Sequence, residues 1–401
     1  MTDAKAYATV TAAYWGFTLT DGALRMLVLL HFHGLGYSPF DIALLFLLYE
    51  FMGVVTNLLG GWLGARLGLR ITLFAGLAVQ VVALSALSMV DETWAVGLSV
   101  AYVMAVQALS GVAKDLTKMS SKSAVKLVAG EEETTLFKWV AVLTGSKNAL
   151  KGVGFFLGGL LLTLLGYQMA LLSMAGALVI VLVVCLVVLT HDLGKAKRKV
   201  KMKHLFSKSR EINLLSAARV FLFCARDVWF VVGVPLFLST EMGWSFTAVG
   251  AFMALWVVGY GFVQAAAPKV IGKADGGAGS ARAARNWAFG LAVLPAAMAL
   301  GLHGGLDPTV MLLGGLGLFG VVFAVNSALH SYLILAYARQ DGVALDVGFY
   351  YMANAVGRLV GTFVSGLAYQ MGGLATCLWV SAALVVLSAL FAVFLSRVKA
   401  R

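Results

Sequence analysis

The sequence is poor in cysteine and in charged residues. Its three cysteines, Cys185, Cys224 and Cys377, each lie in a different apolar stretch. They form no Cys-x-x-Cys pair and no Cys/His cluster with metal-ligand spacing, so we expect neither disulfides nor a thiolate metal site. Charged residues make up 12% of the chain, against about 25% in a soluble globular domain. With 61% hydrophobic residues and a mean hydropathy of +0.92, this composition excludes a water-soluble fold.

Motifs of catalysis and of nucleotide binding are missing as well. No Gly-rich loop ends in Gly-Lys-Ser/Thr, which argues against direct use of ATP. A membrane-embedded enzyme is also not supported, because the sequence has no Ser/His/Asp set, no metal cluster and no paired catalytic carboxylates. We therefore expect neither enzymatic activity nor a cofactor.

The apolar residues fall into twelve runs. A membrane-spanning helix needs about 20 mostly apolar residues. Runs close to that length occur at 9–31, 40–62, 71–90, 94–114, 137–164, 167–190, 212–238, 246–267, 286–302, 309–335, 347–371 and 374–396. The pattern predicts an all-α polytopic membrane protein with twelve transmembrane helices, embedded in a lipid bilayer.

The basic residues indicate the orientation of these helices. If the N-terminus is cytoplasmic, 24 of the 30 Lys and Arg residues lie in cytoplasmic segments and none in an outside loop. The outside loops instead carry Asp41, Asp91, Glu92, Glu241 and Asp307. By the positive-inside rule both termini are cytoplasmic. The net charge of +12 is thus mostly a topology signal, and we expect no nucleic-acid partner.

The longest cytoplasmic connection, His191–Arg210, lies between the sixth and seventh runs. It divides the chain into an N-terminal six-helix half (1–190), a basic cytoplasmic linker (191–211) and a C-terminal six-helix half (212–401). The simplest role for its basic residues is contact with anionic lipid.

The loop between the second and third runs carries a family motif. Two six-helix halves and the segment 61–70, GWLGARLGLR, resemble the major facilitator superfamily. The resemblance implies the major facilitator fold and a gating loop that contains Gly61, Arg66, Gly68 and Arg70. The sequence departs from the family at Ala65, where an Asp usually helps to latch the cytoplasmic side. The segment 152–159, GVGFFLGG, is similar to the fifth helix of antiporter members, but small residues that let helices approach closely explain it more simply.

Three further segments resemble the ArsJ-type organoarsenical exporters. They are residues 21–33 (DGALRMLVLLHFH), 37–41 (YSPFD) and 113–122 (AKDLTKMSSK). The resemblance implies efflux of 1-arseno-3-phosphoglycerate from a bacterial inner membrane and thereby arsenate resistance. It also implies a functional link to a glyceraldehyde-3-phosphate dehydrogenase, which would make this substrate from arsenate.

Six basic residues lie inside the apolar runs, where topology does not explain them: Arg25, Lys147, Lys151, Arg219, Arg226 and Arg358. Three acids share this zone: Asp21, Glu50 and Asp227. A charge at the bilayer centre costs about 2.5–3.5 kcal/mol, so each is a functional candidate. The third, sixth, ninth and twelfth runs carry no charge in their interiors. The facilitator architecture requires this, because those four helices face lipid.

These buried residues make up the candidate substrate site. We predict that Arg25, Lys147, Lys151, Arg226 and Arg358 bind substrate, helped by Asn148, Tyr350 and Asn354. Lys147 and Lys151 are four residues apart on one helix face, where they repel each other unless an anion lies between them. The acids Asp21, Glu50 and Asp227 either pair with cations or carry a coupling proton. For Arg25 and Arg219, structural pairing and substrate contact remain open.

Several functions are compatible with this pattern. The first is a monomeric antiporter that exports a small phosphorylated or arsenylated organic anion by alternating access. An importer or exchanger of sugar phosphates or other organic anions would need the same residues. A proton-coupled multidrug exporter agrees less well with the surplus of buried Lys and Arg. The helix count favours neither a channel nor a receptor.

Overall fold

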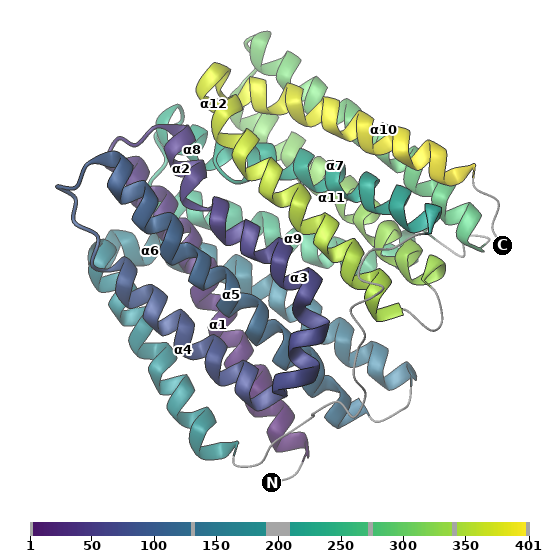
Figure 1. Ribbon diagram of the computed structural model, residues 1–401. Helices are drawn as coiled ribbons and strands as arrows, with labels where there is room; N and C mark the ends of the chain where they lie inside the picture. The colour runs from purple at the N-terminus through teal and green to yellow at the C-terminus, as the bar shows by residue number, and fades with distance from the viewer. Residues whose placement is uncertain (1–2, 130–132, 190–208, 272–275, 339–342, 398–401) are drawn as a thin grey trace. The chain divides into compact units, whose positions relative to one another are not determined.

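The described part of the protein is built from α-helices alone. The computed structural model describes residues 3–129, 133–189, 209–271, 276–338 and 343–397, and these residues contain no strand (Figure 1). In chain order the helices are α1 (Asp3–Gly34), α2 (Pro39–Leu45), α3 (Leu47–Leu67), α4 (Leu69–Leu87), α5 (Val96–Ala129), α6 (Glu133–Val188), α7 (Arg210–Phe230), α8 (Gly233–Thr240), α9 (Phe246–Ile271), α10 (Gly276–His303), α11 (Pro308–Tyr337) and α12 (Val343–Ser396). The all-α class predicted from the sequence is confirmed.

Nine helical segments among the described residues are long and apolar enough to cross a membrane. Two of them, Ser146–Val188 and Asp346–Ser396, are longer than one crossing needs. Each is interrupted by a glycine with positive φ, at Gly166 (73°) and at Gly373 (64°). Glycine adopts this backbone region at no steric cost. Together with α1, which has 32 residues, the described chain thus provides a helix for each of the twelve predicted runs.

The structure corrects some of the predicted boundaries. The fourth predicted run ends at 114, but α5 continues to Ala129. The hydropathy of a helix falls where it leaves the bilayer, although its backbone hydrogen bonds continue. The predicted loop between the second and third runs is reduced to Gly68, whose φ is 76°. Most of the predicted linker, 190–208, lies outside the described residues, and the predicted halves stay a prediction.

The chain forms two compact units. The first unit comprises Met1–Tyr37, Phe51–Met202 and Trp244–Val258, and the second comprises Ser38–Glu50, Lys203–Gly243 and Gly259–Arg401. Two helices therefore contribute to both units. The first turn of α3 belongs to the second unit together with α2, and the first half of α9 belongs to the first unit.

Glycines hold α1 and α6 close together in the first unit. A Cβ atom at Gly154 would lie 2.5 Å from the carbonyl oxygen of Leu19, and one at Gly22 would lie 2.6 Å from that of Lys151. On another side of α6, a Cβ at Gly152 would approach the Ala254 carbonyl of α9 to 2.9 Å. The glycines of the 152–159 segment thus permit close helix contact, the simpler of the two explanations given for them.

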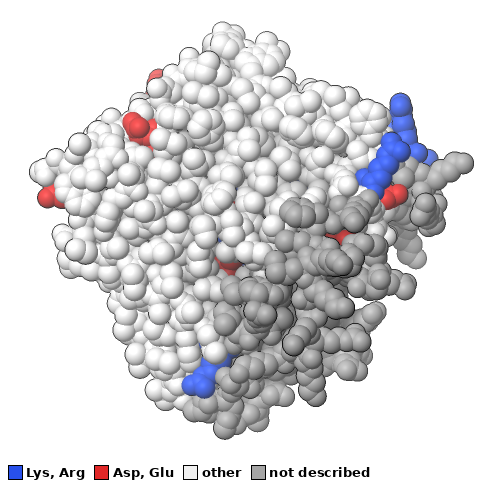
Figure 2. All heavy atoms as spheres, viewed as in Figure 1, with Lys and Arg blue, Asp and Glu red and all other residues white. Residues whose placement is uncertain are grey.

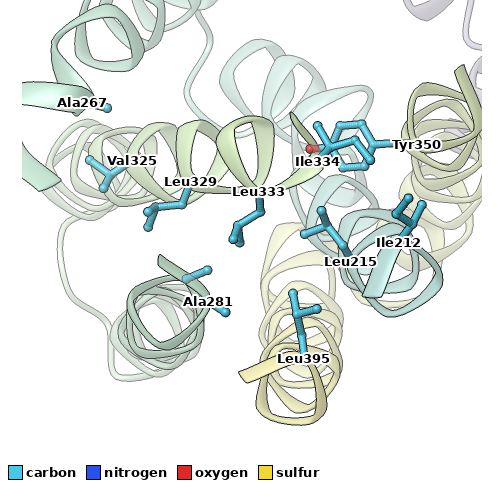
Figure 3. Packing of buried hydrophobic residues seen from close by; sticks show 11 residues of the cluster. Ile212, Leu215, Ala267, Ala281, Val325, Leu329, Leu333, Ile334, Tyr350 and Leu395 are labelled. Carbon is cyan, nitrogen blue, oxygen red and sulfur yellow. The ribbon is translucent and has the colours of Figure 1, made fainter. Parts of the chain in front are cut away.

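The second unit repeats this device with α7 and α12. A Cβ at Gly361 would lie 2.8 Å from the Cβ of Asp227. Beyond the break at Gly373, Ser381 and Ser388 donate hydrogen bonds to backbone carbonyl oxygens of α7, at 2.7 Å and 2.8 Å. A cluster of buried apolar residues fills the space between α7, α9, α10, α11 and α12 (Figure 3): Ile212, Leu215, Ala267, Ala281, Val325, Leu329, Leu333, Ile334, Tyr350 and Leu395.

The outer surface is suited to lipid. Charged side chains are few among the described residues on the face shown in Figure 2. Large apolar side chains are exposed along the second half of α6, such as Ile180 and Val187, and on α9, such as Phe262. Exposure of such a surface to water would be unfavourable in free energy, whereas its contact with the hydrocarbon of a bilayer is not.

We expect Gly154→Ala to destabilise the first unit. Its added methyl group would meet the backbone of α1, which cannot rotate away, and overpacking of this kind costs about 1–3 kcal/mol. Thermal unfolding in detergent should report a lower midpoint. Gly176→Ala on the same helix is the matched control, because no atom lies within 4 Å of the added methyl group. Equal midpoints for the two variants would contradict the packing role of Gly154.

Candidate functional site

Four charged side chains of the second unit form one network. Arg358 of α12 donates to Glu50 of α3 at 2.5 Å. Its Nε lies 3.5 Å from Asp227 of α7. Asp227 in turn accepts from the Nε of its neighbour Arg226 at 2.6 Å and pairs with the Nη2 at 2.5 Å. Two cations and two anions thus connect three helices, and the network is balanced in charge.

Local packing positions the members of this network. Gly361 leaves room for the Cβ of Asp227, so α7 and α12 come close where the charges meet. Glu50 lies in the first turn of α3, which follows α2. α2 begins at Pro39, and the Ser38 hydroxyl caps it by accepting from the Asp41 backbone N–H at 3.1 Å. The Phe40 N–H donates to Gln370 of α12 at 3.2 Å, which fixes the α2 segment against α12.

The arginine side chains of the network are more exposed than the acidic ones. The side chains of Arg226 and Arg358 are 15% and 19% exposed, whereas those of Asp227 and Glu50 are only 1% exposed. The carboxylates therefore lie beneath the guanidinium groups. Arg226 also lies over the rings of Phe223, Phe230 and Phe323, at 4.7, 5.7 and 5.6 Å from their centroids. The two arginines are thus the more exposed members of the network, and the two acids are its buried members.

Two predicted substrate-binding residues, Asn354 and Tyr350, surround a different cation. The Asn354 side chain accepts from the Nε of Arg219 at 2.9 Å, and the Tyr350 ring centroid lies 5.2 Å from the guanidinium carbon. In the sequence Asn354 lies one helical turn before Arg358, and it was predicted to help bind substrate. In the structure its side chain contacts Arg219 of α7, because the neighbours of a side chain depend on which helix packs against its own.

The remaining predicted substrate residues lie in the first unit. Asp21 and Arg25 are buried on α1, and Lys147, Asn148 and Lys151 are half-buried on α6. The close contact of Gly22 with the Lys151 backbone brings these two groups of residues near each other. The Lys151 ammonium lies 5.7 Å from the centroid of the Phe155 ring. The roles of these residues in binding stay predictions.

The predicted gating loop is a tight turn. Gly68 supplies the positive φ between α3 and α4, and the guanidinium of the half-buried Arg70 lies 5.3 Å from the centroid of the Phe74 ring. Gly61 and Arg66 are part of α3, but their side chains lie outside the described residues. The gating role is therefore still a prediction.

Sequence reasoning missed one buried charge, Asp115. It lies just beyond the predicted run 94–114 and was therefore not counted among the buried charges, but it lies inside α5 and is 1% exposed. Asp115 accepts hydrogen bonds from Lys118, at 2.7 Å, and from Thr56 of α3. Lys118 also donates to Asn57 at 2.9 Å. The spacing of Asp115 and Lys118, one helical turn apart, was the available signal for this pair.

The described residues contain no group of three or more His, Cys, Asp or Glu side chains that could hold a metal ion. Cys185, Cys224 and Cys377 are all buried free thiols. The chemistry that the arrangement offers is electrostatic. Two partly accessible guanidinium groups can donate paired hydrogen bonds to the oxygens of a phosphate, arsenate or carboxylate.

Comparison with known proteins identifies the family of the chain. A family model described as the Major Facilitator Superfamily matches residues 7–345. Two solved structures of a POT family transporter align with this chain, one with a thioalcohol-conjugated peptide and one with 5-aminolevulinic acid. Each has a TM-score of 0.73 and 12% sequence identity, and each alignment covers 97% of this chain and 96% of the other. A bacterial homologue of the iron transporter ferroportin, solved in an inward-facing state, aligns with a TM-score of 0.69 at 17% identity, over 99% of this chain and 98% of its own. A search of curated proteins gives no match.

We expect the two ends of the Glu50–Arg358 pair to differ in their contribution to stability. Arg358→Gln leaves a fully buried carboxylate without this partner, a defect that costs about 3–5 kcal/mol. Glu50→Gln should cost clearly less, because Arg358 keeps Asp227 beside it and is partly exposed. The double variant should be more stable than Arg358→Gln alone. Thermal unfolding of the purified protein measures all three.

The matched control for these variants is Arg282→Gln, which removes an exposed arginine of α10 and should leave the unfolding midpoint unchanged. Equal losses in Arg358→Gln and Glu50→Gln would show that the burial of the acid does not govern the stability of the pair.

Proposed function

We propose that this chain exports a small phosphorylated or arsenylated organic anion. It belongs to the major facilitator superfamily and is a multi-pass membrane transporter rather than an enzyme. Secondary transport needs no nucleotide-binding domain, in agreement with the missing Gly-Lys-Ser/Thr loop. The distribution of basic residues counted above supports an orientation with both termini cytoplasmic, and the resemblance to the organoarsenical exporters implies a bacterial inner membrane. We expect it to work as a monomer.

One observation carries the proposal for an anion. In the network of the second unit, the side chains of Arg226 and Arg358 are 15% and 19% exposed, whereas those of their carboxylate partners are 1% exposed. An approaching solute therefore meets N–H donors and positive charge. A cationic drug would meet repulsion at the same place, which counts against multidrug export. Oxyanions with several oxygen atoms suit the planar fork of arginine better than any other class of small solute.

The first unit supports the same ligand class. Arg25, Lys147 and Lys151 are buried or half-buried near the middle of their helices, where substrate sites of such transporters lie. We propose that these cations bind the anion at some stage of an alternating-access cycle. The first unit thus contains basic residues suited to the same class of ligand as those of the second unit.

The buried acids suggest how transport is driven. Asp227 and Glu50 form ion pairs with Arg226 and Arg358. If one of these acids takes up a proton, its arginine is released toward the anion, and proton movement is coupled to anion movement. We propose proton coupling through these acids in place of a substrate-driven uniporter, because the acids are in direct contact with the cations.

The identity of the anion rests on the family resemblance. We propose 1-arseno-3-phosphoglycerate, which carries an oxyanion group at each end, and arsenate resistance as the consequence. Two of the three resembling segments hold buried charges in the structure: Asp21 and Arg25 on α1, and Asp115 with Lys118 on α5. The third contains the Ser38 cap and Pro39 at the start of α2. An importer or exchanger of sugar phosphates would use the same contacts in the other direction.

Expression in arsenic-sensitive bacteria tests this proposal. We expect resistance to arsenate only when a glyceraldehyde-3-phosphate dehydrogenase that makes the arsenylated product is expressed as well. Lys147→Ala should abolish the resistance at normal protein levels, because a central positive charge is lost. Lys5→Ala, which removes an exposed lysine of α1, is the control and should keep it.

Different outcomes point to different substrates. Resistance that does not depend on the dehydrogenase would contradict the proposed substrate. Uptake of a labelled sugar phosphate into cells, without any resistance, would instead identify the importer. Resistance to cationic drugs that survives Lys147→Ala would contradict anion transport altogether.

A further inference from the structure

Arg219 differs from the cations of the network, because the charge it brings into the interior is not balanced. It lies on α7 about two turns before Arg226, and 4% of its surface is exposed. Its contacts within the described residues include no carboxylate. We propose that Arg219 is an anion-binding residue of the second unit, whose counter-charge is an oxyanion group of the transported solute.

The contacts of Arg219 orient its guanidinium without neutralising it. The Nε donates to Asn354, and the Nη1 donates to the side-chain oxygen of Ser327 at 3.0 Å and to its carbonyl oxygen at 3.3 Å. The rings of Phe223 and Tyr350 lie near the guanidinium carbon, with centroids at 4.0 and 5.2 Å. All of these partners are neutral. They hold the guanidinium plane in place from α11 and α12, and from α7 itself.

Burial of a cation among neutral partners is unfavourable. The hydrogen bonds and ring contacts replace part of the lost hydration, but a buried charge is compensated well only by an opposite charge. In the same unit Arg226 and Arg358 have such partners, so this sequence can supply carboxylates where they are needed. Because Arg219 has no carboxylate partner among the described residues, we infer that a ligand supplies the opposite charge.

His330 provides a second, independent indication. It lies on α11 one turn beyond Ser327, which accepts from Arg219, and is 1% exposed. Its Nδ1 is buried and has no hydrogen-bond partner among the described residues. Buried polar atoms usually have one, and a neutral imidazole can donate from one ring nitrogen. An anion held by Arg219 would accept that hydrogen bond.

An anion could reach this site along its less buried edge. Asn354, at the Nε end of Arg219, is half-buried, and so is Tyr260 of α9. The Tyr260 hydroxyl lies 3.4 Å from the side-chain oxygen of Ser327. The ligand class is a single phosphate, arsenate or carboxylate group, because one guanidinium and one imidazole satisfy one such group. Only the identity of the whole solute rests on the proposed function.

Ligand-dependent stability of the full chain tests the inference. Thermal unfolding is measured in detergent with increasing inorganic phosphate, arsenate or 3-phosphoglycerate, against chloride at equal ionic strength. We expect the wild type to unfold at a higher temperature as the oxyanion concentration rises. Arg219→Gln should lose this shift, whereas the exposed control Arg282→Gln should keep it. An Arg219→Gln protein with the wild-type response would overturn the inference.

The stability without ligand separates a binding role from a structural one. If Arg219 serves to bind a ligand, Arg219→Gln should leave the unfolding temperature in chloride unchanged or raise it, because an unfavourable buried charge is removed. A large decrease in chloride, with the oxyanion shift intact, would mean that Arg219 only joins helices. Stabilisation by anionic-lipid nanodiscs but by none of the soluble oxyanions would identify a lipid site and also overturn the inference.

A second variant covers the case in which Arg219→Gln does not fold. Arg219→Lys keeps the charge but loses the planar fork, so at least about tenfold more phosphate should be needed for half of the maximal shift. An unchanged phosphate dependence in this variant would contradict the inference. A further outcome is that phosphate raises the unfolding temperature only when Arg219 is present, while expression gives no arsenate resistance. That result would support the binding site and contradict the proposed substrate.

Discussion

Hydrocarbon does not solvate charge, and the interior of this protein is arranged around that constraint. The described buried acids for which the structure gives an ion pair each lie next to a basic residue: Glu50 with Arg358, Asp227 with Arg226, and Asp115 with Lys118. In each pair the acid is 1% exposed and the base 15–23%. The long basic side chains reach toward polar surroundings while the short acids stay behind them. The pairs thus keep the chain stable in lipid and leave positive charge where a solute can meet it.

Glycine lets helices come close around the pair that joins two of them. The pairs Asp227–Arg226 and Asp115–Lys118 each lie within one helix, whereas Glu50 and Arg358 join α3 to α12. Gly361 allows α12 to lie against Asp227, and the close contact of Gly22 with α6 brings Arg25 and Lys151 into one region. The helix contacts and the charge contacts are therefore parts of one arrangement. A larger residue at these glycines would separate the charges as well as the helices.

The sequence predicted the fold well, because hydropathy and the positive-inside rule depend on local composition. The helices agree with the twelve runs, and even the glycine interruptions at Gly166 and Gly373 lie between predicted spans. The extension of α5 to Ala129 was missed, since hydropathy measures contact with lipid and not helix formation. As a result Asp115 was not counted among the buried charges, although it is among the most buried acids.

The partners of the candidate residues could not be predicted in the same way. Glu50 and Arg358 are 308 residues apart, and their contact depends on how α2 and the first turn of α3 pack on α12. Asn354 is close to Arg358 in sequence, yet its side chain accepts from Arg219. The sequence did identify which charges are buried, because a charge inside an apolar run is visible without a structure. Which charge is neutralised by which depends on tertiary contacts.

The difference between paired and unpaired arginines has a consequence for transport. An anion that binds Arg358 or Arg226 competes with a carboxylate already in contact, so part of its binding free energy is used to replace Glu50 or Asp227. At Arg219 there is no such competitor among the described residues, and the anion gains the full interaction with a preoriented guanidinium. A carrier needs both properties, because a solute that is bound too tightly in every state is never released. We infer that Arg219 contributes affinity, while the paired arginines make binding reversible and sensitive to the protonation of their acids.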